Sequence, residues 1–153
     1  MLNSDGGIET DLTVVCIEKD HFRIISSAAT RERDKFHINK HLAKDVELKD
    51  VTDDYCVFGV FGPKSRALMK SISKDNFEND NFRFSTAKYI TIEGIKIWTQ
   101  RLSYVGELGY ELYVKSEDAK KIYELLVNKG KNFNLSNCGM HAMDIMRMES
   151  GFL

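Results

Sequence analysis

The chain has 153 residues, of which 42% are hydrophobic and 10% aromatic, and its 22 basic residues nearly balance 23 acidic ones. This composition is typical of a globular protein with one domain, or with one domain and part of a second. Because the charges nearly cancel, the sequence lacks the broad positive field on which binding to a phosphate backbone depends, and we expect no nucleic-acid partner.

The cysteines and the N-terminal residues indicate the compartment. Cys16, Cys56 and Cys138 are odd in number, widely spaced and not part of a C-x-x-C pair, which is typical of thiols in a reducing environment. No apolar run approaches the ~18 residues of a membrane span. The stretch MLNSDGGIETD carries carboxylates where a signal peptide needs basic and then apolar residues. We expect a protein of the cytoplasm, or of the mitochondrial matrix if the source is eukaryotic, with no membrane partner.

The first third of the chain predicts a hairpin and a helix. Two short runs rich in β-branched residues, 12–17 and 21–28, form the expected hairpin. Residues 30–44 predict an exposed amphipathic helix with Thr30 as its N-cap. The apolar residues of this helix are Phe36, Ile38 and Leu42. The tract KDVELKDVTDD, residues 44–54, is the best candidate for a seam between two parts of the chain.

The middle of the chain begins with YCVFGVFG, residues 55–62, which predicts a strand covered on both faces. Gly62 and Pro63 then predict a corner into a short helix. The buried side of that helix consists of Leu68, Met69 and Ile72. The asparagine-rich tract 74–85 predicts a loop.

Period-two alternation on both sides of Glu93-Gly94 predicts a second hairpin. A further strand, after a short turn at Gly-Glu-Leu-Gly, would run through Glu111. Helices are predicted over 116–130, where Gly130 supplies the stop, and over HAMDIMRMES at 141–150, with a short strand between them.

From Tyr55 onward this order predicts an α+β fold with ferredoxin-like elements, in which an antiparallel sheet has its helices packed on one face. Both ends look cut, because the last helix has a methionine-rich face with nothing downstream to pack against. We therefore expect a fold truncated at both ends, whose exposed apolar surface suits self-association.

Two stretches offer chemistry. In GGIETDL, residues 6–12, Asp11 lies where a glycine loop becomes a strand, and such a carboxylate can accept a proton from a ligand amine. The alternative is a solvated strand entry. In RLSYVGELGYELYV, residues 101–114, alternation places Glu111 and Tyr113 on one face of a strand. The other face takes Tyr110, Leu112 and Val114.

A hairpin in the second stretch would bring Tyr104, before the turn, and Glu111, after it, to one cavity. There Glu111 could offer two acceptor oxygens to a flat heterocycle that carries paired N–H donors. The alternative is a plain hairpin with surface carboxylates.

Other features favour structural roles. The corner GPKSR, residues 62–66, could bind a phosphate but more often only turns the chain. His37 and His41 lie on a lysine-rich helix face without the glutamate of a zinc-protease motif, so no metal site is predicted. The methionines near the C-terminus are interpreted as core residues. They are Met140, Met143, Met146 and Met148.

Four motifs in order, GGIETDLTV, FGPKSRALM, LSYVGELGYELYV and MDIMRMESG, resemble the aminomethyltransferase family. That family comprises the T-protein of the glycine cleavage system and the folate-binding parts of dimethylglycine and sarcosine dehydrogenases. The resemblance covers essentially the whole chain, and residues 8–11 and 104–109 are more similar to the dehydrogenase branch. It implies a partial first aminomethyltransferase subdomain at 1–50 and a ferredoxin-like subdomain at 51–153.

The resemblance also implies a tetrahydrofolate site. Asp11 matches the catalytic aspartate that handles the proton at the folate amine, Glu111 matches the glutamate that binds the pterin edge, and Tyr104 matches a tyrosine of the same pocket. FAD would belong only to a separate domain absent from this chain. Met143 stands where T-proteins carry an arginine that helps to hold the folate, so anchoring of the folate tail must differ, and Arg147 is interpreted as structural.

The implied function is transfer of a one-carbon unit, derived from a methylated amine, to tetrahydrofolate, by a domain of a dimethylglycine or sarcosine dehydrogenase-like protein. Two alternatives remain open. One is a fragment of a glycine cleavage T-protein or of a related folate-dependent demethylase, and the other is a non-catalytic, degenerate binding module.

Overall fold

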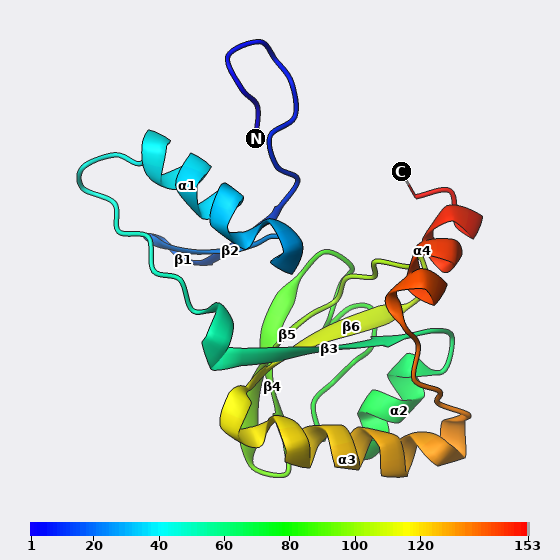
Figure 1. Cartoon of the computed structure of the whole chain (residues 1–153). Coiled ribbons are helices and arrows are strands. Elements are labelled where there is room, and N and C mark those ends of the chain that lie inside the picture. Colours follow the sequence, from blue (N-terminus) through cyan, green and yellow to red (C-terminus); the bar gives the residue numbers. More distant parts are fainter. Residues whose placement is uncertain (153) are drawn as a thin grey trace. The chain divides into compact units, whose positions relative to one another are not determined.

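A computed structural model describes residues 1–152, which form two compact units, one from Met1 to Asp50 and one from Val51 onward. In the first unit, strands β1 (Thr13–Glu18) and β2 (His21–Ile25) pair antiparallel, and helix α1 (Arg31–His41) follows (Figure 1). The predicted hairpin and helix are therefore confirmed. No helix among residues 1–152 is long and apolar enough to cross a membrane.

Helix α1 does not bury the apolar side that its sequence predicted. Phe36 is 73% exposed, whereas Asp34 is only 2% exposed. Thr30 precedes the helix as expected, but its hydroxyl donates to Asp34 Oδ2 at 2.6 Å and makes no capping hydrogen bond to the backbone. The amphipathic prediction is wrong at Phe36, because a hydrogen-bonded carboxylate occupies the inward side of the helix.

The buried position of Asp34 has opposing effects on its acidity. Burial by itself would raise the pKa of the Asp34 carboxyl, because it disfavours the charged form. Hydrogen bonds from Thr30, Thr10 and Ser26, together with the positive charge of Arg33, outweigh burial and hold the pKa below its ordinary value. The folded first unit therefore favours the ionised form of Asp34.

The second unit is built on one four-stranded antiparallel sheet with the strand order β3-β6-β5-β4. Its strands are β3 (Tyr55–Phe61), β4 (Ala87–Ile92), β5 (Ile95–Gln100) and β6 (Gly109–Lys115). Its helices are α2 (Ser65–Ile72), α3 (Ala119–Gly130) and α4 (Met140–Glu149). Figure 1 shows α2 and α3 on the same side of the sheet, which confirms the expected α+β class with helices packed on one face.

One hydrophobic core lies between the sheet and these two helices. Strand alternation sends every second side chain of β6 into it, and those side chains are Tyr110, Leu112 and Val114, each fully buried. Leu68 from α2 and Ile122 from α3 close the core from the helical side. The same alternation leaves Glu111 and Tyr113 on the opposite face of the sheet, as the sequence predicted.

Strand β3 is not covered on both faces as expected. In the described chain it pairs only with β6 and therefore forms one edge of the sheet, and Val57 is 52% exposed. An apolar run predicts a buried strand, but it does not say whether the second face will be covered by this chain.

The loops largely follow the sequence, with two exceptions. Glu93 and Gly94 both have positive φ, 49° and 81°, which is the geometry of a type I′ hairpin turn and confirms the second hairpin. Residues 134–139 contain no strand in the structure, so the strand predicted between the last two helices is wrong. Helix α3 ends at Gly130, as expected, but Gly130 itself is right-handed (φ −61°), and the left-handed residue is Asn134 (φ 59°), after a 3₁₀ turn.

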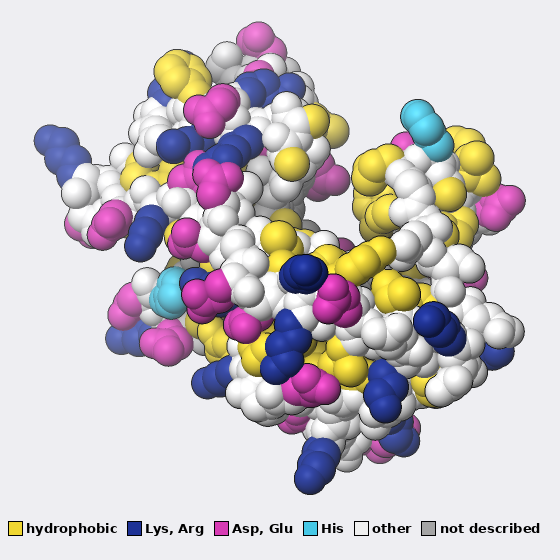
Figure 2. Space-filling view, turned by 60° about the horizontal axis from the view of Figure 1, so that its bottom comes forward, with side chains coloured by type: hydrophobic (Ala, Val, Ile, Leu, Met, Phe, Trp, Pro, Cys, Tyr) yellow, Lys and Arg dark blue, Asp and Glu magenta, His cyan; other side chains and the backbone are white. Residues whose placement is uncertain are grey.

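Charged side chains of both signs are interspersed over the face of the molecule shown in Figure 2. Apolar side chains gather instead on α4, where Met140, Ile145 and Met148 are 62%, 53% and 70% exposed. The prediction that the α4 methionines are core residues is wrong, because none of the residues of α4 is buried in this structure.

Candidate functional site

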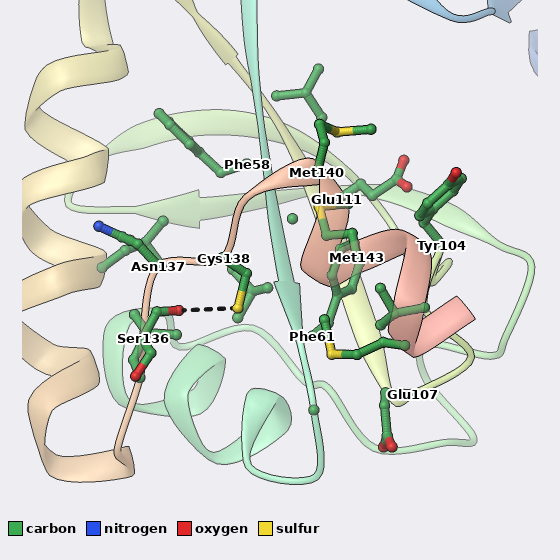
Figure 3. Close-up of a pocket in the computed structure, with 18 of the residues that line it drawn as sticks. Phe58, Phe61, Tyr104, Glu107, Glu111, Ser136, Asn137, Cys138, Met140 and Met143 are labelled. Carbon is green, nitrogen blue, oxygen red and sulfur yellow. Dashed lines mark hydrogen bonds between the residues drawn. The ribbon is translucent and has the colours of Figure 1, made fainter. Parts of the chain in front are cut away.

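A hollow of about 720 Å³ lies along β3 in the second unit (Figure 3). Its walls come from β3, α3, the segment 135–138, α4 and the loop 104–107, and all of its lining residues belong to the second unit. The lining is mainly apolar, with a few polar side chains at its margins. These polar side chains are Tyr104, Glu107, Glu111, Tyr123, Ser136 and Asn137. A hollow of this size and character is suited to a small organic molecule.

A phenyl ring forms a flat apolar surface in this hollow. The Phe61 ring lies against Gly59, where a Cβ atom would come within 2.5 Å of the ring, and it lies even closer to the Cβ position of Gly109. Gly59 and Glu111 are directly paired in the β3–β6 ladder, as are Phe61 and Gly109. The two glycines are therefore needed for the close approach of Phe61, whose ring lies over Gly59, the ladder partner of Glu111.

Glu111 lies at the centre of β6, half-buried, and points away from the core. Its neighbour on β5 is Gln100, and its Oε2 accepts a hydrogen bond of 2.9 Å from the Tyr113 hydroxyl. Because a carboxylate can accept about four hydrogen bonds, the pair leaves acceptor capacity for a ligand. Figure 3 shows the Glu111 carboxylate near Tyr104 at one end of the hollow.

Tyr104 is not held by a short turn between two strands. Strand β5 ends at Gln100 and β6 begins at Gly109, so Tyr104 lies in the loop 101–108. Its hydroxyl donates to Asp144 Oδ1 (2.9 Å) and accepts from Arg147 Nη1 (3.0 Å), and the Arg147 guanidinium lies 5.1 Å from the ring centroid. The predicted short turn is therefore wrong, although Tyr104 and Glu111 do line the same hollow.

These contacts hold helix α4 beside the hollow. Ser150, just after α4, donates from Oγ to the Val105 carbonyl at 2.9 Å, and its side chain fills the space next to Gly106. Together with the Tyr104 contacts, this fixes both the helix and the loop. As a result, three methionines of α4 form part of the wall of the hollow, and the interpretation of Arg147 as a structural residue agrees with its contacts. The methionines are Met140, Met143 and Met146.

Asp11 belongs to the first unit and not to the lining of the hollow. It is exposed and lies two residues before β1, after a loop in which Gly6 has a φ of 80°. The Asn3 side chain organises that loop, since its Oδ1 accepts from the backbone N–H groups of Gly7 (2.8 Å) and Asp5 (3.1 Å). The positive φ at Gly6 agrees with the unusual backbone angles expected of the glycine pair.

Sequence reasoning missed several residues that shape this site. Alternation places Tyr113 on the face of Glu111, but it does not predict the hydrogen bond to the carboxylate. Gln100 could only be found from the β5–β6 register, and Asp144 only from the packing of α4. Gly59 and Gly109 are visible in the sequence, but only the β3–β6 pairing shows that both lie against the Phe61 ring.

Comparisons with known proteins find relatives along nearly the whole chain. Human mitochondrial dimethylglycine dehydrogenase is 32% identical over 155 residues, and 4-methylaminobutanoate oxidase (formaldehyde-forming) from Paenarthrobacter nicotinovorans is 33% identical over 153 residues. An aminomethyltransferase from Halothermothrix orenii is 30% identical over 153 residues. Each match covers 99% of this chain, which spans 18% of the first two relatives and 42% of the third.

A solved structure shows the same fold at low sequence identity. Heterotetrameric sarcosine oxidase from Corynebacterium sp. U-96 superposes with a TM-score of 0.66 and 12% identity, over 87% of this chain and 66% of that one. The family model described as the GCVT N-terminal domain matches residues 1–153. The chain therefore belongs to the GCVT N-terminal domain family.

Proposed function

We propose that this chain is the tetrahydrofolate-binding part of a protein that transfers one-carbon units, of the kind found in dimethylglycine and sarcosine dehydrogenases. The observation that carries the proposal is the Glu111 carboxylate, which is exposed to a hollow of about 720 Å³ beside a flat aromatic ring. The pyrimidine ring of a reduced pterin is flat and carries neighbouring N–H donors. A carboxylate with free acceptor capacity is the complementary group for such an edge.

The hollow has the composition that a pterin requires. Pockets for small molecules typically have volumes of about 300–1,000 Å³ and combine an apolar lining with a few polar groups that fix orientation. Phe61 supplies an apolar surface for the ring, and Glu111 supplies the acceptors. Met143 in the wall offers no charge to a folate tail, so we propose that the tail is held by other groups or extends to solvent.

Asp11 would act on the proton at the folate amine, in keeping with its family match, and keep that amine nucleophilic. When bound, tetrahydrofolate supplies the nitrogen atoms that take up the one-carbon unit. Glu111 would orient the ring, while Phe61, Met140 and Tyr104 exclude water from that end of the hollow. We also propose that residues 1–50 are a partial first aminomethyltransferase subdomain and residues 51–153 a ferredoxin-like subdomain.

The relatives also support proposals on the location and the ligands of this chain. The human relative is named as a mitochondrial enzyme, and we propose a cytoplasmic or mitochondrial-matrix location for this chain. The partner would be a folate and a one-carbon unit from a methylated amine, with any flavin held in a separate domain. The aminomethyltransferase match supports a second candidate, a glycine cleavage T-protein, which ammonia release from an aminomethylated lipoyl carrier protein would detect.

Calorimetric titration of the chain with tetrahydrofolate tests the proposal. Glu111→Gln is expected to weaken binding by at least tenfold, because hydrogen bonds to a charged group contribute about 1.5–3 kcal/mol. Glu117→Gln is the matched control, since Glu117 is exposed and lies outside the lining of the hollow, and its affinity should stay within twofold. Equal affinity of the Glu111→Gln variant and the unmodified chain would contradict the proposal, as would no binding at all.

A further inference from the structure

Three side chains near Glu111 form a connected group on the face of the sheet opposite the core, away from α2 and α3. Glu111 and Tyr113 are two residues apart on β6 and therefore point to the same side. Gln100 on β5 is paired directly with Glu111, and Trp98 is paired with Tyr113. Gln100 and Tyr113 are 2% and 7% exposed, so both are buried polar groups that require hydrogen-bond partners.

The hydrogen bonds of this group run in one direction. Gln100 Nε2 donates to the Tyr113 hydroxyl at 2.7 Å, and that hydroxyl donates to Glu111 Oε2 at 2.9 Å. A phenol has a single proton, so Tyr113 can donate to the carboxylate only if Gln100 presents its NH₂ group to the phenol oxygen. With the amide reversed, the proton would go to Gln100, and two oxygen atoms would face each other without a proton between them. An ionised Glu111 thus selects this direction.

Trp98 limits the movement of the central residue of the group. The indole and the Tyr113 ring are 4.7 Å apart at an angle of 65°, an edge-to-face contact. A rotation of Tyr113 away from Glu111 would lose this contact as well as both hydrogen bonds. The phenol is therefore fixed in position, and with it Oε2 of the carboxylate.

From this geometry we propose that Tyr113 and Gln100 are positioning residues, which hold the Glu111 carboxylate so that its free acceptors face the donor edge of a flat heterocycle in the hollow. The identity of that heterocycle as a pterin rests on the proposed function above. The benefit is preorganisation, since a carboxylate that is already oriented loses little side-chain freedom when the ligand binds. Gly59, opposite Glu111 on β3, has no side chain, and the Phe61 ring that lies over it lines the hollow together with Glu111.

The test uses Tyr113→Phe, which keeps the ring against Trp98 and removes only the hydroxyl. Tetrahydrofolate and its 2-desamino-2-methyl analogue, which lacks one of the ring donors, are titrated into each variant. We expect Tyr113→Phe to weaken tetrahydrofolate binding about tenfold and binding of the analogue less than twofold. In a Glu111→Gln background, Tyr113→Phe should have no further effect beyond twofold. Tyr89→Phe, an exposed tyrosine of β4, is the matched control and should behave as the unmodified chain.

Equal weakening of both ligands, or effects of Tyr113→Phe and Glu111→Gln that simply add, would indicate a structural role and overturn the inference. A measurement without ligand tests the positioning role separately from the proposed function. Side-chain NMR couplings should show one Glu111 rotamer in the unmodified chain and several in both Tyr113→Phe and Gln100→Leu. If Glu111 stays in one rotamer in these variants, the positioning role is wrong even if tetrahydrofolate binds. If tetrahydrofolate does not bind while the rotamers respond as expected, the positioning role stands and the ligand assignment fails.

Discussion

Replacing Tyr110 by phenylalanine is expected to stabilise the second unit, although Tyr110 is a fully buried residue of its core. The Tyr110 ring contacts Phe77 edge-on at 5.4 Å and Phe82 at 5.6 Å, and these contacts remain in the variant. Its hydroxyl, however, is buried and has no hydrogen-bond partner among residues 1–152. Such a group costs about 1–3 kcal/mol of stability, which removal of the oxygen recovers.

Two opposing effects set the size of this gain. The missing hydroxyl leaves a void of roughly 10–15 Å³, which at about 24 cal/mol per Å³ costs only about 0.3 kcal/mol. The free energy of unfolding should therefore rise by about 1 kcal/mol. With a urea dependence of about 2 kcal/mol per M, the midpoint of unfolding would rise by about 0.5 M.

Urea unfolding can be followed by the fluorescence of Trp98, the only tryptophan of the chain, which lies in the same unit. Tyr123→Phe is the control. Its hydroxyl is exposed and accepts a hydrogen bond from Asn137 Nδ2 at 2.7 Å, so that variant should change the free energy of unfolding by less than about 0.5 kcal/mol. A decrease of the midpoint in Tyr110→Phe would refute the reasoning, because it would mean that the hydroxyl is satisfied in the folded protein.

Two further predictions concern the site and the first unit. Gly109→Ala places a methyl group against the Phe61 ring and should lower the free energy of unfolding by about 1–3 kcal/mol. Adding Phe61→Leu to this variant should recover part of the lost stability, as measured by urea unfolding. If the effects of the two substitutions on the free energy of unfolding simply add, the contact between Gly109 and Phe61 is contradicted. Because the pKa of Asp34 is lowered in the folded state, its ionised form stabilises the first unit above the ordinary value of 3.8, and this stability is lost as the pH falls through the folded pKa. Unfolding followed by amide resonances of the first unit should thus show an advantage of the unmodified chain over Asp34→Asn that is constant above about pH 5 and shrinks below about pH 4. If the stability advantage of the unmodified chain over Asp34→Asn grows as the pH falls, the proposed role of the ionised Asp34 is contradicted.

The order of strands and helices and the α+β class followed from local patterns. Period-two alternation and the Glu93-Gly94 pair located the second hairpin, and alternation along 109–115 assigned Glu111 and Tyr113 to one face. These features depend on neighbouring residues, whose conformational preferences are nearly independent of the rest of the fold. The motif that contains Tyr104 and Glu111 is likewise one contiguous stretch, so the amino-acid sequence alone was enough to indicate the family.

Which side chains are buried, and which residues they contact, was decided instead by tertiary structure. Phe77 and Phe82 lie in a polar loop and yet are fully buried, because the loop folds over the core and packs them against Tyr110. Phe36 has the expected helical position but remains exposed, since the inward side of its helix is taken by Asp34. No local pattern distinguishes these cases, because the burial of a side chain depends on which distant segment of the chain packs against it.

The sequence by itself determined most of the elements, their order, the two-faced character of β6 and the residue types available to a ligand. Tertiary structure alone decided that Gln100 and Tyr113 stand behind Glu111 and that Phe61 lies over two glycines. The physical reason is that a side chain's direction follows from its own strand, whereas its neighbours follow from the register between strands. That register is set by packing over the whole sheet, and it is what gives the candidate site its geometry.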